Sequence, residues 1–290
     1  YSFDMFTQVA RTARAGGAPL GNAKVQHVIA AGESQSAFAL VTYVNGVQPI
    51  THAFDGFFVH SRGAVGLGLV GPGKSADIAG AIAGTASIFR TDTTVPIMDV
   101  QAETDVGGVL RSAAARQPDS KTFRLWEVPG TAHADRHLMG AVADSLDCGA
   151  PINDGPLHVV TKAAFHALQD WVDAGTLPRQ APRLTTTGAD NSQISRDADG
   201  IALGGVRTPP VDVPVEVLSG VPGPKQSTIC LLLGSTQPLS AARLAALYPN
   251  RAAYTTKFGK ALATAITQGY VLAADRVAMQ AYAHPEKVAG

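Results

Sequence analysis

The stretch Gly32-Glu33-Ser34-Gln35-Ser36 lies between two segments of different character. The apolar run at residues 25–31 is typical of a buried β-strand, and residues 37–44 have the composition of a helix. A serine on so short a connection is held in a sharp turn, so the residues two before and two after it must be small. Gly32 and Ser36 meet this requirement. The stretch predicts a strand–turn–helix unit that presents the Ser34 hydroxyl above the edge of a sheet. It fits equally well an ordinary polar turn in which Ser34 only caps the helix.

Further strands and helices are expected on both sides of this unit. Short apolar runs at residues 57–60, 95–100 and 123–128 predict three more strands. Residues 1–14 and 158–174 carry apolar side chains at helical spacing. Strands that alternate with helices indicate an α/β fold with a mostly parallel sheet flanked by helices.

A shift in composition after Pro182 divides the chain into two predicted parts. Residues 1–184 contain the alternating strands and helices and form the predicted core. Residues 185–200 are polar and rich in turn-forming side chains, and several prolines follow them. We expect residues 185–290 to form a C-terminal extension that packs on the core or caps it.

The overall composition excludes several classes of protein. The chain has 290 residues, with 23 Lys and Arg against 23 Asp and Glu, and 46% of its residues are hydrophobic. This is too apolar for a disordered chain, and the charge is too balanced for a broad nucleic-acid surface. No apolar run is long enough to predict a membrane span. The composition predicts a folded protein without a nucleic-acid partner.

The two cysteines, Cys148 and Cys230, do not form a C-x-x-C pair, so a zinc ribbon is not expected. Cys230 lies in an apolar run at residues 229–233, which favours a pair of buried thiols. A single disulfide in an oxidising compartment is the alternative.

Residues that could activate Ser34 follow two of the predicted strands. A nucleophilic serine needs a histidine as base and a carboxylate to orient that histidine. Glu103 and Asp105 come just after the run at 95–100, and Asp105 is preferred for its offset past the strand, with Glu103 in reserve. His133 follows the run at 123–128 in a loop of small residues. The alternative is that these acids only cap and solvate a loop.

Several segments together make the chain resemble the α/β-hydrolase-fold serine esterases, and more narrowly a bacterial family of alpha/beta hydrolase domain proteins. The resemblance spans nearly the whole chain. It is carried chiefly by Gly32-Glu33-Ser34-Gln35-Ser36-Ala37, by Glu103-Thr104-Asp105-Val106 and by Trp126-Glu127-Val128-Pro129-Gly130-Thr131-Ala132-His133-Ala134-Asp135. The order serine, acid, histidine is also that of this fold.

The resemblance implies Ser34 as nucleophile, His133 as base and Asp105 as the orienting acid. It implies hydrolysis of a small-molecule carboxylic ester without a metal or an organic cofactor. The backbone N–H of Gln35, directly after the nucleophile, would be one donor of the oxyanion hole. It also favours a secreted or periplasmic protein over a cytoplasmic one.

One feature departs from the pattern of this fold, in which the nucleophile turn follows the fifth strand. Only 33 residues precede Ser34, too few for four earlier strands and their helices. The second oxyanion donor usually comes from a loop far upstream. We therefore expect the chain to be the C-terminal portion of a larger protein, without its N-terminal strands, which a companion segment or chain would complete.

Two alternative functions compete with this hypothesis. Gly68-Leu69-Val70-Gly71-Pro72-Gly73-Lys74-Ser75 matches the phosphate-binding pattern G-x-x-x-x-G-K-[ST]. Such a loop needs a buried strand before it and a firm helix after it, and glycines interrupt both neighbouring segments. The third possibility is a non-catalytic binding protein built on a hydrolase fold. The presence of a serine, an acid and a histidine together argues against a non-catalytic protein.

Overall fold

The computed structural model describes residues 1–188, 191–225 and 227–290, so residues 189–190 and 226 of the predicted extension lie outside it. Its strands are β1 (Ile29–Glu33), β2 (Gly56–His60), β3 (Ile97–Ala102), β4 (Phe123–Val128), β5 (Thr186–Thr187), β6 (Gln193–Ile194), β7 (Glu216–Ser219) and β8 (Ser235–Pro238). Its α-helices are α1 (Ser2–Ala15), α2 (Gln35–Thr42), α3 (Gln48–Thr51), α4 (Ile78–Ile82), α5 (Glu103–Val106), α6 (Arg136–Met139), α7 (Leu157–Ala174), α8 (Pro209–Asp212), α9 (Ala241–Leu247), α10 (Arg251–Thr267) and α11 (Arg276–Gln280).

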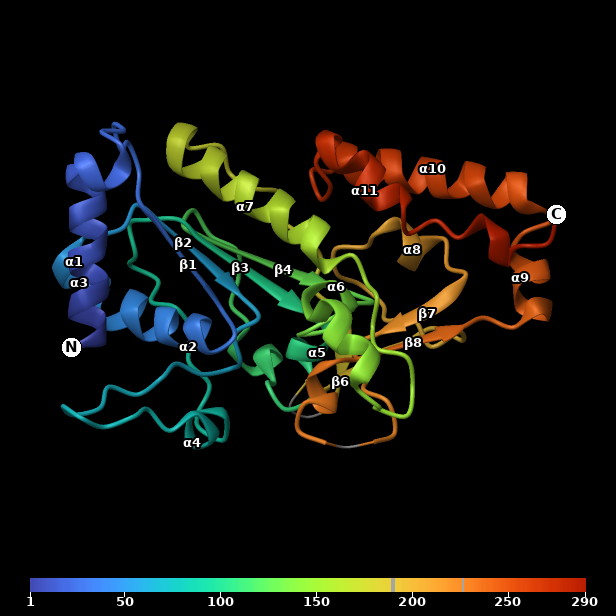
Figure 1. Cartoon of the computed structure of the whole chain (residues 1–290), viewed down its shortest axis with the longest axis horizontal. Coiled ribbons are helices and arrows are strands. Elements are labelled where there is room, and N and C mark those ends of the chain that lie inside the picture. Colours follow the sequence, from blue (N-terminus) through green and yellow to red (C-terminus); the bar gives the residue numbers. More distant parts are fainter. Residues whose placement is uncertain (189–190, 226) are drawn as a thin grey trace.

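The central element is a four-stranded sheet in the order β1-β2-β3-β4. Every neighbouring pair in it is parallel, which confirms the predicted parallel sheet. Parallel strands all end at the same edge of a sheet, and here their arrows end beside α5 and α6 (Figure 1). β1, which leads into Ser34, is the outer strand on one side of this sheet.

The two faces of the sheet bury different sets of side chains because successive residues of a strand point to opposite faces. α1 and α2 cover one face, and α7 covers the other (Figure 1). The first face is packed with Phe57, Val59, Ile97, Phe123 and Leu125. The second is packed with Phe58, Met98, Val100, Trp126 and Val128.

The predicted extension packs against α7 and the end of β4. Val159 on α7 shares a buried cluster with Leu262 and Met279, and the rings of Trp126 and Tyr270 meet edge to face at 5.0 Å. The β7–β8 hairpin lies beyond the ends of the central strands (Figure 1). The division of the chain at residue 184 stays a prediction.

Two strands begin later than their apolar runs predict. β1 starts at Ile29 rather than at residue 25, and β3 starts at Ile97 rather than at residue 95. The N–H of Val28 donates to the carboxylate of Asp55 at 2.7 Å, so the backbone before β1 pairs with a side chain instead of a strand. For β1 and β3, the apolar runs therefore located the strand but not its first residue.

The preference for two free thiols is wrong, because Cys148 and Cys230 form a disulfide. Both cysteines are buried, as predicted, in a cluster with Ile152 and Leu233. The apolar run at 229–233 forms a short 3₁₀ turn against this cluster, which brings the two Cα atoms within 5.5 Å. Burial and disulfide bonding are compatible at this separation. No helix of the described residues is long and apolar enough to cross a membrane.

A buried ion pair joins the segment after β2 to β3. The Nε of Arg62 lies 2.7 Å from Oδ2 of Asp99, and both side chains are almost wholly buried. Arg62 also donates to the carbonyl oxygens of Ser87 and Ala115. Its guanidinium therefore holds two loops against the sheet, and it depends on Asp99 for charge compensation.

Asp99→Asn should destabilise the fold because it leaves the Arg62 charge uncompensated in the interior. We expect a loss of about 3 kcal/mol in the free energy of unfolding, measured by urea denaturation. The control is Asp92→Asn, which breaks the exposed pair with Arg90 and should leave the urea midpoint unchanged. Equal effects of the two substitutions would contradict this account of the core.

Candidate active site

The turn at Ser34 has a strained backbone. Ser34 adopts φ 53° and ψ −122°, a region that residues other than glycine rarely occupy. Its N–H donates to the carbonyl oxygen of His60 at 3.0 Å, which ties the turn to the end of β2. A Cβ at Gly32 would come within 2.9 Å of Leu40 and of the Ser36 carbonyl. Close contact with α2 therefore explains why position 32 requires a small residue.

The structure brings Ser34, His133 and Asp105 together in one hydrogen-bonded chain. The Oγ of Ser34 lies 2.9 Å from Nε2 of His133. The other ring nitrogen, Nδ1, lies 2.7 Å from Oδ1 of Asp105. These three residues follow the carboxyl ends of β1, β4 and β3, which all lie at the same edge of the sheet because its strands are parallel. Such a chain can move a proton from a hydroxyl to an imidazole and stabilise the resulting cation.

Asp105 and Glu103 lie on the same short helix, α5, but have different partners. The second oxygen of Asp105 accepts from the N–H of Ala102 at 2.7 Å, so the carboxylate is held from both sides. Glu103 accepts from the N–H groups of Gly130 and Gly220, at 2.7 and 2.8 Å. Arg196 pairs with it at 2.5 Å. Glu103 therefore binds backbone N–H groups and Arg196, whereas Asp105 contacts His133.

The loop that carries His133 is held by hydrogen bonds on both of its sides. Gly130 turns the chain after β4 with φ 72°, and its carbonyl oxygen accepts from Nδ2 of Asn153 at 3.1 Å. On the other side the N–H of Ala134 donates to the carbonyl oxygen of Leu232 at 3.1 Å. His133 is thus positioned by contacts with segments far away in the sequence.

Burial and charge act in opposite directions on His133. Burial disfavours the charged imidazolium, but the Asp105 carboxylate favours it both by its charge and by its hydrogen bond, and Glu33 adds to this effect. The pKa of His133 is therefore raised above its usual value of 6.5. The imidazole is neutral, and able to accept a proton, only above this raised pKa.

Two residues beside these three were not predicted to be part of the site. His60 ends β2 and lies next to Glu33 in the register, with its Nδ1 3.9 Å from the Glu33 carboxylate. Burial lowers the pKa of His60 despite the nearby carboxylates. Glu33 belongs to the motif at residues 32–36, but the sequence did not predict a role for it. The sequence could have identified Glu33 and His60 by their position at the carboxyl ends of two neighbouring strands.

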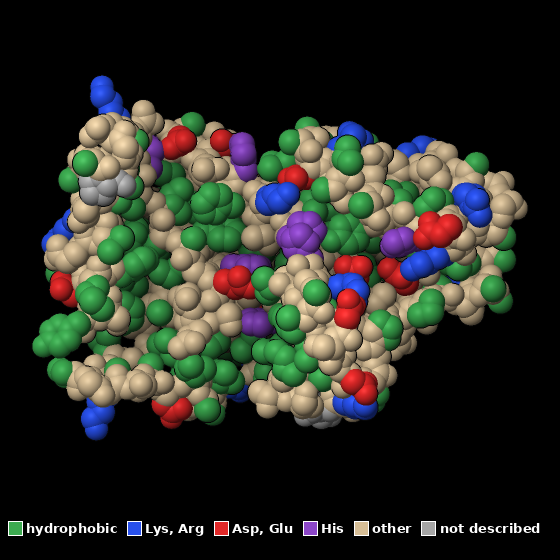
Figure 2. All heavy atoms as spheres, viewed as in Figure 1, with side chains coloured by type: hydrophobic (Ala, Val, Ile, Leu, Met, Phe, Trp, Pro, Cys, Tyr) green, Lys and Arg blue, Asp and Glu red, His purple; other side chains and the backbone are tan. Residues whose placement is uncertain are grey.

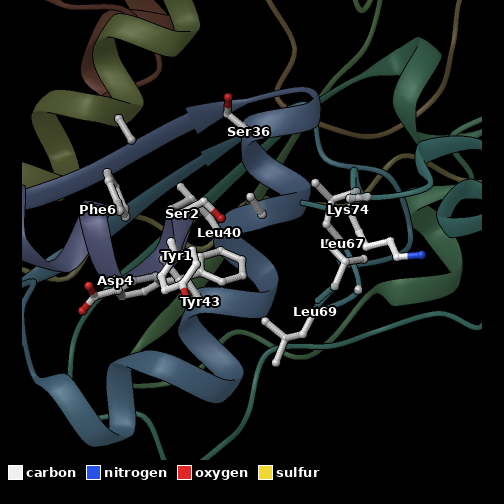
Figure 3. Close-up of a pocket in the computed structure, with 16 residues that line it drawn as sticks. Tyr1, Ser2, Asp4, Phe6, Ser36, Leu40, Tyr43, Leu67, Leu69 and Lys74 are labelled. Carbon is white, nitrogen blue, oxygen red and sulfur yellow. The ribbon is translucent and has the colours of Figure 1, made fainter. Parts of the chain in front are cut away.

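The glycine-rich segment Gly68–Ser75 does not have the context of a phosphate-binding loop. It is irregular apart from a turn at 72–73, no strand among the described residues leads into it, and the five-residue helix α4 begins only at Ile78. Lys74 lines a largely apolar cavity of about 580 Å³ with Tyr1, Leu40 and Tyr43. Figure 3 shows the Lys74 ammonium extending away from the rings of Tyr1 and Tyr43. No group of His, Cys, Asp or Glu in the described parts of the chain could hold a metal ion.

Comparison with known proteins assigns the chain to a family. Residues 1–281 match the family model described as "Alpha/beta hydrolase domain". No curated protein and no solved structure matches the chain. The comparisons do not bear out the prediction that the chain is a C-terminal portion of a larger protein. That prediction rests on the small number of residues before Ser34 and on the usual upstream position of the second oxyanion donor.

The raised pKa of His133 should respond to the carboxylates around it. Asp105→Asn should lower this pKa most, and Glu33→Gln should lower it by a smaller amount, since each removes a negative charge that favours the imidazolium. Glu286→Gln, on a remote and exposed side chain, is the matched control. The measurement is an NMR titration of the His133 ring, and a pKa unchanged in Asp105→Asn would refute this electrostatic account.

Proposed function

The chain belongs to the alpha/beta hydrolase domain family, and from that premise we propose that it is a serine hydrolase that cleaves carboxylic esters. The single observation that carries the proposal is the continuous hydrogen-bonded chain from Ser34 through His133 to Asp105. Family membership supports a hydrolase of this fold. The choice of an ester and the role of each residue are our proposal.

In the proposed acylation step, Ser34 Oγ attacks the acyl carbon while its proton passes to Nε2 of His133. Asp105 keeps the proton on Nδ1 and stabilises the imidazolium. The imidazolium then gives its proton to the departing alcohol oxygen, and the acyl–serine ester remains. In the second step His133 takes a proton from water as the water oxygen attacks the acyl carbon. The bond from that carbon to Ser34 Oγ then breaks, the imidazolium returns its proton to Oγ, and the acid leaves.

The negative oxygen of each tetrahedral intermediate needs hydrogen-bond donors. Gln35 is the first residue of α2, and the N–H at this helix position has no acceptor within the helix. The positive end of the helix dipole adds to its effect. Both features support Gln35 as one oxyanion donor.

Ser34→Ala should abolish hydrolysis of a short p-nitrophenyl ester, because the attacking oxygen is removed. A fluorophosphonate probe should label the parent chain at Ser34 alone, as shown by intact mass and peptide mapping. Ser36→Ala, in the same turn and of equal size, is the control and should still be labelled. Turnover that persists in Ser34→Ala would refute the proposed nucleophile.

Asp105→Asn should lower kcat by about 10⁴-fold, because the amide stabilises the wrong tautomer of His133. Glu103→Gln should act mainly on stability, since it removes the charge that compensates Arg196, and its effect on kcat should be far smaller. Steady-state kinetics and thermal unfolding of the two variants separate these outcomes. A larger loss of kcat in Glu103→Gln would reverse the assignment of the acid.

A further inference from the structure

A second cavity, of about 290 Å³, lies directly beside the base. His133 forms part of its wall, with Glu33 at the end of β1 and Asp135 two residues farther along the loop. The first half of α7 closes the opposite side with His158 and Lys162. Figure 2 shows histidine side chains gathered near the middle of the corresponding face, with acidic side chains beside them. Its volume suits a small part of a substrate rather than a whole drug-sized ligand.

The charges around this cavity are predominantly negative. Glu33 and Asp135 contribute two carboxylates, and the Glu33 side chain is 42% exposed and thus accessible to a ligand. Lys162 is the one Lys or Arg among the described residues that line this wall, and its Nζ is already paired with Asp275 at 2.8 Å. An anionic substrate group would meet repulsion here, and a cationic group would find a partner.

The histidines of the wall differ in their electrostatics: the pKa of His133 is raised by the Asp105 carboxylate, whereas burial lowers the pKa of His60. The rings of His137 and His158 stack with their centroids 3.6 Å apart and their planes at 9°. Burial, with the neighbouring His137 and Lys162, lowers the pKa of His158 to about 4, so this ring is uncharged at neutral pH. The stacked pair therefore gives the cavity a flat wall next to the carboxylates.

We propose that this cavity binds the alcohol part of the ester and that Glu33 selects alcohols that carry a positive charge. The leaving oxygen must receive its proton from Nε2 of His133, so the alcohol has to lie on the side of the site that His133 borders. Glu33 directly precedes the nucleophile in the chain, and its side chain lines the same cavity as His133. This inference rests on the proposed function and adds the substrate class.

The test compares two esters that differ only in charge, butyrylcholine and 3,3-dimethylbutyl butyrate. In the second ester a carbon replaces the quaternary nitrogen, so shape is kept and charge is lost. The full chain should have a higher kcat/KM for butyrylcholine, and the preference should shrink as salt is added. The ratio of the two kcat/KM values is the readout, because general damage to the site affects both esters alike.

Glu33→Gln should reduce this ratio by about fivefold, the upper range for a partly exposed ion pair. Lys162→Gln should increase it, because Asp275 then loses its partner and adds negative charge to the region. Glu286→Gln, remote from the cavity, is the matched control and should leave the ratio unchanged.

Equal kcat/KM values for the two esters in the parent chain would overturn the inference, as would a ratio that is unchanged in Glu33→Gln. If neither ester is hydrolysed while the fluorophosphonate probe labels Ser34, the proposed alcohol is wrong and the serine hydrolase stands. If Ser34 is not labelled, the proposed function fails and this inference fails with it.

Discussion

The hydrogen bond from the Ser34 N–H to the His60 carbonyl oxygen, 3.0 Å long, ties the strained turn to the sheet. A serine with positive φ is held only if its surroundings outweigh the strain. Here the parallel pairing of β1 with β2 supplies the acceptor, and α2 packs so closely on Gly32 that a Cβ at this position would clash with it. The same parallel order delivers the acid and the histidine to this edge, so the whole candidate site depends on the sheet.

The two neighbouring carboxylates of Glu103 and Asp105 have different partners. Glu103 and Asp105 are both buried on α5, and residues two apart on a helix do not face the same direction. Asp105 faces the histidine and raises its pKa, whereas Glu103 receives N–H groups and an arginine from other loops. An uncompensated buried carboxylate would destabilise the fold, so each is fully engaged.

Residues after 184 support the site, although none of the three central residues lies among them. Leu232 accepts from the loop of His133, and Gly220 donates to Glu103 beside Asp105. The disulfide between Cys148 and Cys230 holds this region to the segment after α6. Loops that follow the strands of a sheet are otherwise free to move, and these contacts fix the distance between acid and base.

The sequence by itself determined the parallel α/β architecture, the turn at Ser34 and His133 as the candidate base, and it preferred Asp105 to Glu103 as the acid. Apolar periodicity and small residues at fixed spacing are local properties, and they can be seen without coordinates. Only the tertiary structure decided that Asp105 rather than Glu103 contacts His133, that the cysteines are bonded, and that Glu33 and His60 border the site. These depend on contacts between residues far apart in the chain, and no local pattern records which way a buried side chain points.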